Sequence, residues 1–253
     1  MGGEGLEEAV EATAELLSRS TYAIVFTGSG ISSEAGIPTF RGRDGLWNKY
    51  RPEELASPEA FKRDPLRVWR WYAWRLKLVL QARPTPAHRV IAALENRGLV
   101  RSVVTQNVDG LHQRAGSRNV IELHGSILRA RCTGCGYKWM IDRVLEDSEL
   151  PLRCPRCSSL ARPDVVWFGE ALPPDALRRA YSEFLKADLV LVVGTSGVVE
   201  PAGSLPLLAV ENGAKLVNIN LEPNRYSGIA HVNYMGSSSG FFKALAERLK
   251  ISI

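Results

Sequence analysis

Short apolar runs rich in β-branched residues alternate with stretches of helical periodicity along most of this chain. The apolar runs lie at residues 22–26, 102–105, 120–123, 189–193 and 216–219. Helical patterns cover residues 85–96, 175–186, 204–212 and 239–249, and an acidic amphipathic helix is expected near the N-terminus. Strands that alternate with helices in this way predict an α/β fold with a doubly wound parallel sheet.

Polar or small residues occur at the ends of all five apolar runs. The motifs are Gly28-Ser29-Gly30, Gln106-Asn107-Val108-Asp109, His124-Gly125, Gly194-Thr195-Ser196 and Asn218-Ile219-Asn220. Taken singly, each motif is explained by a turn or a helix cap. The carboxyl ends of parallel strands meet at one edge of a sheet, which is where doubly wound sheets bind ligands. Together the five motifs therefore predict one shared binding crevice.

The segment YAIVFTGSGISSEAGIPTFR, residues 22–41, says most about function. A strand that delivers glycines to the start of a helical turn can cradle a phosphate, because free N–H groups point at the anion. The full dinucleotide fingerprint is absent, since Ser33 occupies the third glycine position. Glycine also serves turns through its dihedral freedom alone, so this segment by itself leaves both a phosphate site and a plain turn open.

The composition is that of an ordinary globular protein. The chain has 253 residues, of which 45% are hydrophobic and 23% charged. It contains no apolar run of about 18 residues, so we expect a cytoplasmic protein with no membrane partner. The net charge is +5, and residues 41–101 hold 14 Lys or Arg against 6 Asp or Glu. This excess would attract acidic partners, or nucleic acid weakly, but a solvated basic face is the simpler interpretation.

All four cysteines fall in one window, as Cys132-x-x-Cys135 and Cys154-x-x-Cys157, with 18 residues between the pairs. This is the spacing of a tetrahedral zinc site, in which each C-x-x-C turn aims two thiolates at one ion. Two disulfides are the alternative, which an intracellular setting disfavours. A shell of four sulfurs is closed, so the spacing predicts one structural zinc and no catalytic metal.

The motifs, in their order along the chain, resemble those of the sirtuins, a family of NAD-dependent protein-lysine deacylases. GSGISSEAGIPTFR resembles the glycine-rich NAD loop of that family, and TQNVDGLH at residues 105–112 its second signature. ELHGS at 122–126 matches the segment with the catalytic histidine, VVWFGE at 165–170 the acyl-lysine channel, and GTS and IN further cofactor contacts. Ser29 and Ala35 stand where alanine and serine are usual, and GSSSG at 236–240 lacks the lysine–alanine pair expected beside the adenine.

The resemblance implies a role for each matching residue. NAD would be bound by Gly28, Ser29, Gly30, Ile31, Glu34, Ala35, Pro38, Thr39, Phe40, Arg41, Trp47, Gln106, Asn107, Val108, Asp109, Gly194, Thr195, Ser196, Asn220, Leu221, Glu222 and Ser238. Acyl-lysine would lie against Val165, Val166, Trp167, Phe168, Gly169 and Glu170.

The same resemblance implies the chemistry. The acyl oxygen would attack the ribose carbon that bears nicotinamide, and His124 would act as general base on a ribose hydroxyl, a role that suits neutral imidazole. Asn107 and Asp109 would orient the nicotinamide ribose and a water. The products would be nicotinamide and O-acyl-ADP-ribose.

Tyr72 and Arg75, in the helical stretch at residues 68–80, bear on the choice of acyl group. They lie three residues apart and so share one helix face. A guanidinium fork and a phenol can together bind a carboxylate, and the pair resembles one in the sirtuin branch that removes succinyl and malonyl groups. A packed tyrosine beside a snorkelling arginine is the alternative. With the resemblance, we favour an acyl pocket that accepts acids.

The resemblance also implies a two-lobed enzyme. An NAD-binding Rossmann-like domain would be built from residues 1–41, 85–125 and 163–253, and a small lobe from a helical insertion at 42–84 and a zinc ribbon at 126–162. Its partners would be acylated-lysine proteins or peptides, including proteins of chromatin, with no direct binding of nucleic acid. Two alternatives remain: an enzyme that transfers ADP-ribose to protein, and a zinc-ribbon module that binds nucleic acid. A dehydrogenase is disfavoured, because no segment resembles its substrate domain.

Overall fold

The chain forms the predicted doubly wound sheet in a computed structural model that describes residues 5–42 and 45–252. Six parallel strands lie in the order β3-β2-β1-β7-β8-β9. Their bounds are β1 Ala23–Thr27, β2 Ser102–Thr105, β3 Val120–Glu122, β7 Leu189–Val193, β8 Lys215–Asn220 and β9 Val232–Met235. Five strands agree with the predicted runs to within one residue at each end, whereas β9 was not predicted.

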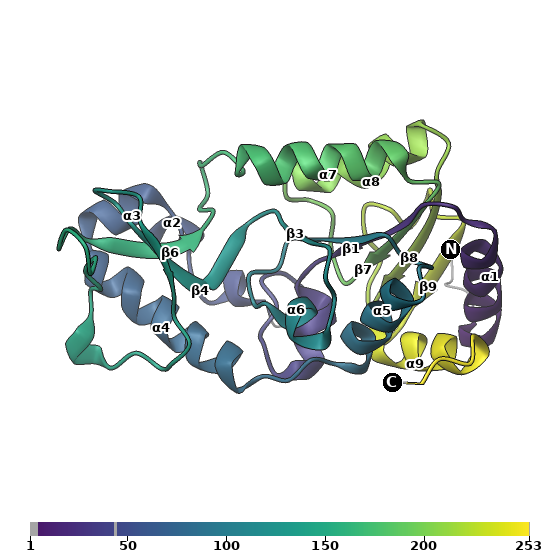
Figure 1. Ribbon diagram of the computed structural model, residues 1–253, viewed down its shortest axis with the longest axis horizontal. Coiled ribbons are helices and arrows are strands. Elements are labelled where there is room, and N and C mark those ends of the chain that lie inside the picture. The colour runs from purple at the N-terminus through teal and green to yellow at the C-terminus, as the bar shows by residue number, and fades with distance from the viewer. Residues whose placement is uncertain (1–4, 43–44, 253) are drawn as a thin grey trace.

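Helices cover both faces of this sheet (Figure 1). One face packs against α1 Leu6–Arg19, α5 Pro86–Asn96 and α9 Ser238–Arg248, and the other against α7 Pro174–Lys186, the short η4 Ala202–Ser204 and α8 Leu205–Glu211. Alternate residues of a strand enter the two cores; Leu191 packs with the first group and Val192 with the second. Strands buried on both faces need continuous apolar runs, which is why the sequence pattern was clear.

A smaller lobe lies at the other end of the molecule (Figure 1). It contains η2 Leu46–Asn48, α2 Pro52–Leu55, α3 Pro58–Arg63, α4 Pro65–Gln81, η3 Asp147–Glu149 and an antiparallel sheet of β4 Gly125–Cys132, β5 Lys138–Met140 and β6 Ala161–Val165. Proline at the first position starts α2, α3 and α4, where its missing N–H costs nothing. Trp69 ties α4 to β6 by donating from Nε1 to the carbonyl of Ala161 at 2.7 Å.

The pairing of β4 with β6 is regular at both ends and interrupted between them. Gly125 pairs with Val165 and Ser126 with Asp164, and the register then shifts so that Ala130 pairs with Pro163. Because β6 runs across the predicted domain boundary between residues 162 and 163, the division of the chain into domains stays a prediction.

The carboxyl ends of the central strands are level with one another. Thr27 of β1 pairs with both Thr105 of β2 and Val193 of β7, and Val193 pairs with Ile219 of β8. The residues that follow each strand therefore meet at one edge, and the chain order reverses between β1 and β7. Such a reversal opens a crevice that doubly wound folds use for ligands.

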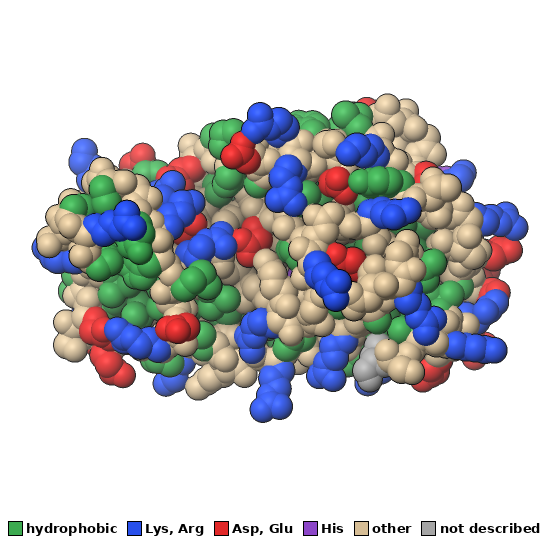
Figure 2. Space-filling model, viewed as in Figure 1, with side chains coloured by type: hydrophobic (Ala, Val, Ile, Leu, Met, Phe, Trp, Pro, Cys, Tyr) green, Lys and Arg blue, Asp and Glu red, His purple; other side chains and the backbone are tan. Residues whose placement is uncertain are grey.

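The described side chains on the face shown in Figure 2 form no single basic patch. On the face shown in Figure 2, Lys and Arg side chains are spread over both lobes among acidic and apolar ones. Among residues 5–42 and 45–252, no helix has the length and apolar character needed to cross a membrane.

Candidate active site

The glycine turn lies at the reversal point between β1 and β7, directly before the 3₁₀ helix η1, Ser29–Ala35. The amide of Gly30 donates to the carbonyl of Gly194 at 2.8 Å. A Cβ on Gly30 would lie 2.7 Å from the Cα of Gly194, and one on Gly28 would lie 2.6 Å from the Cβ of Thr195. The structure thus gives these glycines a second use besides the predicted approach to an anion, because two stretches of protein touch here.

A cavity of about 900 Å³ extends from this turn into the small lobe. It is lined by His124, Tyr72, Arg75, all six residues of the VVWFGE segment and most of the predicted NAD-binding residues. The exceptions are Ile31, Glu34, Ala35, Asp109 and Ser238. Glu34 and Ser238 line an adjoining cavity of about 240 Å³ that shares Gly30, Gly194 and Asn220 with the first. The structure therefore brings nearly all of the predicted site residues to one connected hollow.

Three of these exceptions, Ile31, Glu34 and Ala35, lie on η1. Residues three apart share a face of a 3₁₀ helix, so Gly30, Ser33 and Gly36 line the large cavity while Ile31 is fully buried in the core. Glu34 faces α9 instead, where its carboxylate accepts a hydrogen bond from Ser237 Oγ at 2.8 Å. Ala35 packs against the core of the small lobe.

His124 is held in one tautomer. Its Nδ1 lies 3.0 Å from the backbone carbonyl of Gln106, and a carbonyl can only accept, so Nδ1 carries the proton. The lone pair is therefore on Nε2, in a side chain that lines the large cavity. Burial lowers the pKa of His124 below 6.5, although the Gln106 carbonyl acts in the opposite direction. The imidazole is thus neutral at pH 7, as a general base must be.

Asn107 and Asp109 are joined through Ser32, which sequence reasoning did not single out. Asn107 Nδ2 donates to the Gly28 carbonyl at 2.9 Å and more loosely to Ser32 Oγ, which in turn donates to Asp109 at 2.7 Å. The other carboxylate oxygen of Asp109 accepts from the amide of Leu111 at the start of α6, Leu111–Ala115. Burial raises the pKa of Asp109, against the effect of these hydrogen bonds. Asn107 lines the cavity, whereas Asp109 is buried and does not.

His112 contacts the ends of β1 and β2 through a chain of hydrogen bonds. Its Nε2 lies 2.9 Å from Thr27 Oγ1, which donates to Thr105 Oγ1 at 2.8 Å. The Thr105 hydroxyl also accepts from the amide of Asn107 at 3.0 Å. Burial lowers the pKa of His112 well below 6.5, so this ring is a neutral, packed group.

Tyr72 and Arg75 lie at the small-lobe end of the cavity. The Tyr72 hydroxyl accepts from Trp167 Nε1 at 2.9 Å, and burial raises the pKa of Tyr72 to about 12, so the phenol keeps its proton. The Arg75 side chain is 6% exposed, with its guanidinium 4.5 Å from the ring centre of Phe40 and 4.9 Å from that of Trp71. It does not snorkel, and no acceptor within the described residues hydrogen-bonds to it. Burial lowers the pKa of Arg75, and the charge of Asp109 opposes this shift. Arg75 and Asp109 nevertheless form no ion pair.

The four cysteines lie together as predicted. Their sulfurs are all within 4.8 Å of one another, and all four thiols are free of disulfides. The distances are 3.4 Å between Cys132 and Cys157 and 3.7 Å between Cys135 and Cys154. Zn–S bonds of about 2.3 Å in a tetrahedron require sulfurs about 3.8 Å apart. The donor set and its spacing therefore fit one zinc ion with a closed shell.

Fold and site together define an α/β nucleotide-binding enzyme with a zinc-ribbon lobe. The sequence model of the Sir2 family matches residues 28–201, and the chain belongs to this family. It is 53% identical over 246 residues to an NAD-dependent protein deacylase of Aeropyrum pernix, which covers 97% of this chain and 100% of the relative. An NAD-dependent protein deacylase of Pyrococcus furiosus is 55% identical over 241 residues, 93% of this chain and 96% of the relative.

Solved structures agree with this placement. The complex of a Sir2 homologue with NAD has a TM-score of 0.91 at 46% identity and covers 99% of this chain and 96% of its own. A Sir2 protein with a deacetylated p53 peptide and 3′-O-acetyl ADP-ribose has a TM-score of 0.90 at 39% identity, over 96% of this chain and 99% of its own. The predicted sirtuin resemblance and fold class are confirmed.

Proposed function

We propose that this chain is an NAD-dependent protein deacylase that moves an acyl group from lysine to the ADP-ribose part of NAD, releasing nicotinamide and O-acyl-ADP-ribose. One observation carries the proposal. A neutral imidazole, His124, presents a free Nε2 where the glycine-turn cavity meets the VVWFGE segment, whose Val166 amide donates to the His124 carbonyl at 2.9 Å. A base between a nucleotide cradle and a peptide channel suits transfer between the two ligands.

Each residue contributes in its own way. NAD, when bound, supplies an electrophilic ribose carbon and a hydroxyl that takes the acyl group. His124 accepts the proton of that hydroxyl, while the Gln106 carbonyl fixes the ring. Asn107, whose Nδ2 is engaged by Gly28, presents its Oδ1 to orient the ribose and a water, and Asp109 holds Asn107 through Ser32.

A direct test uses NAD and acetyl-lysine peptide with the wild type and with His124→Ala. Wild type should release nicotinamide and O-acetyl-ADP-ribose in equal amounts, and the variant should lose roughly 100-fold or more, the range of a general base, while its Kd for NAD stays the same. Labelled ADP-ribose left on protein, without deacetylated peptide, would favour an ADP-ribosyltransferase. Near-normal turnover by His124→Ala would remove His124 from the mechanism.

We further propose that the acyl pocket accepts succinyl and malonyl groups. A buried guanidinium without a hydrogen-bond acceptor is costly, so the fork of Arg75 is suited to a ligand carboxylate. The Tyr72 hydroxyl accepts from Trp167 and keeps its own proton free to donate to the same carboxylate. Acetyl-lysine offers no such group. Burial lowers the pKa of Arg75, and the neighbouring Tyr72 and Asp109 offset part of that effect.

We also propose that the zinc is structural and that the substrates are acylated-lysine proteins. The closed sulfur shell leaves no position for a reacting ligand. The three-part NAD domain and the two-part small lobe remain our proposed division of the chain, with residues 161–165 shared through β6.

A further inference from the structure

We infer that Arg162, which none of the sequence motifs includes, positions the wall of the acyl-lysine channel by holding Trp167 in place. This inference rests on the proposed function, because it concerns which acyl groups the channel admits. Trp167 lines the large cavity and is 2% exposed. Its position therefore determines how wide the channel is.

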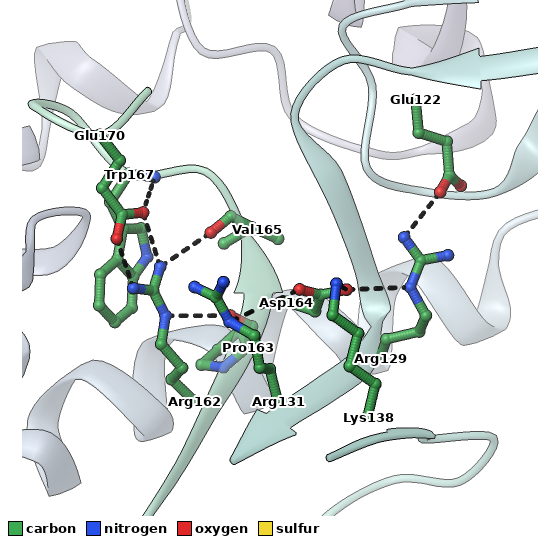
Figure 3. A network of polar contacts seen from close by, with 10 residues as sticks. All are labelled: Glu122, Arg129, Arg131, Lys138, Arg162, Pro163, Asp164, Val165, Trp167 and Glu170. Carbon is green, nitrogen blue, oxygen red and sulfur yellow. Dashed lines mark hydrogen bonds and ion pairs between the residues drawn. The ribbon is translucent and has the colours of Figure 1, made fainter. Parts of the chain in front are cut away.

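Arg162 contacts the channel segment at several points (Figure 3). Its two terminal nitrogens form a bidentate pair with Glu170, at 2.5 and 2.8 Å, and Nη2 also donates to the carbonyl of Val165 at 2.9 Å. The guanidinium carbon lies 3.3 Å from the ring centre of Trp167. Arg162 is only 7% exposed. A bidentate pair that is shielded from water in this way fixes the relative positions of its two side chains.

Trp167 is consequently fixed at its backbone, on a ring face and at its ring nitrogen. Its amide donates to Glu170, the same carboxylate that Arg162 engages, at 2.8 Å. Arg162 covers one face of the ring, and Nε1 donates to the Tyr72 hydroxyl at 2.9 Å. Without Arg162, Glu170 would turn toward water and release the amide. The indole would then be free to tilt, and the Tyr72 hydroxyl would lose a defined donor.

The neighbouring charges provide a matched control. Arg129 lies on the same small sheet and pairs with Glu122 at 2.8 Å and with Asp164 at 3.2 Å (Figure 3). It is an arginine held by two carboxylates, yet no hydrogen bond or ring contact joins it to Trp167 or Glu170 within the described residues. If loss of an ion pair merely loosened the small lobe, Arg129→Met and Arg162→Met would have similar effects.

The experiment compares acetyl-lysine and butyryl-lysine peptides in wild type, Arg162→Met, Arg162→Lys and Arg129→Met. Peptide Kd is measured by fluorescence anisotropy and kcat/KM by nicotinamide release at saturating NAD. We expect Arg162→Met to weaken acetyl-peptide binding about tenfold, because the displaced indole of Trp167 loses aromatic packing against the acyl-lysine. A wider channel penalises the small acyl group more, so the preference for butyryl over acetyl should rise at least threefold. Arg162→Lys should recover part of both losses. Arg129→Met should change neither the affinity for acetyl peptide nor the preference for butyryl over acetyl.

The outcomes separate this inference from the proposed function. An unchanged acyl preference in Arg162→Met, with both peptides weakened alike, would overturn the positioning role, as would an equal effect of Arg129→Met. A parallel fall in affinity for NAD would do the same, because Arg162 would then only support the fold. Peptide binding needs no turnover, so wild-type protein that binds acyl peptides without deacylating them would refute the proposed function and still test Arg162. Should Arg162→Met not fold, Arg162→Lys and Trp167→Phe, which removes the Nε1 donor, must each shift the preference.

Discussion

Replacing Arg75 by methionine tests the acidic acyl pocket most directly. The change leaves a shorter, uncharged apolar side chain and removes the charge and the fork, together with the guanidinium contacts to the rings of Phe40 and Trp71. Arginine stays protonated even where burial lowers its pKa, as at Arg75, so the wild-type side chain offers a cation to the channel. A succinyl carboxylate would lose this partner in the variant, whereas an acetyl group has no partner to lose.

The magnitudes follow from the two kinds of contact. A charged hydrogen bond in a desolvated site is worth about 1.5–3 kcal/mol, or roughly 10- to 150-fold in kcat/KM for succinyl-lysine peptide. Loss of the cation over Phe40, part of the proposed NAD loop, costs about 0.5–1 kcal/mol, so activity on acetyl-lysine should also fall by roughly two- to fivefold. The succinyl preference should therefore drop by about tenfold or more.

The assay is nicotinamide release with peptides that differ only in the acyl group. Arg75→Lys should recover only part of the preference, because an ammonium cannot form the two-pronged contact. Lys77→Met removes a positive charge from the exposed side of the same helix and should leave both activities unchanged. Equal losses on both peptides in Arg75→Met would refute the reasoning, since Arg75 would then serve only to hold the cofactor loop.

Two further predictions concern the base and the metal. Burial lowers the pKa of His124, and the base must be neutral to act. The apparent pKa of the acid limb in the pH profile of kcat/KM should therefore lie below 6.5, and a value at or above 6.5 would contradict the assignment. Purified protein should contain about one zinc per chain, and Cys154→Ser should lose the metal and expose residues 126–162 to protease. A metal-free variant with the protease resistance of wild type would show that zinc does not hold the lobe together.

The sequence predicted those strands and site residues that a simple physical rule controls. The central strands are buried on both faces, so their apolar runs were distinct, whereas β9 is an edge strand in which Asn233 and Tyr234 are only half-buried. His124 and Asn107 lie two residues after the ends of β3 and β2, where the rule for parallel sheets places ligands.

Other parts of the site depend on contacts between distant segments. Ser32 donates a hydrogen bond to Asp109, which is 77 residues away in the sequence. The residues next to Ser32 in the sequence do not predict this contact. The resemblance assigned Ile31 and Glu34 to the cofactor as members of a motif. Whether a residue of that motif faces the cavity depends on the 3₁₀ geometry of η1, which the sequence pattern does not specify. Arg162 was not singled out because two of its partners, Trp167 and Glu170, lie in the loop after β6, where no periodic pattern predicts contacts.

Insertions and deletions should be tolerated very unequally along the zinc ribbon. The pairing of Gly125 with Val165 places the residue after His124 opposite the first residue of the channel, so base and channel share one rung of the β4–β6 ladder. A residue added to either strand near this rung would move His124 relative to the acyl-lysine, and with a period of two it would also turn side chains to the other face. The largely exposed segment at residues 142–149, which includes η3, lies between the two cysteine pairs and away in the sequence from both Gly125 and Val165. We therefore expect insertions or deletions there to leave the position of His124 relative to the channel unchanged.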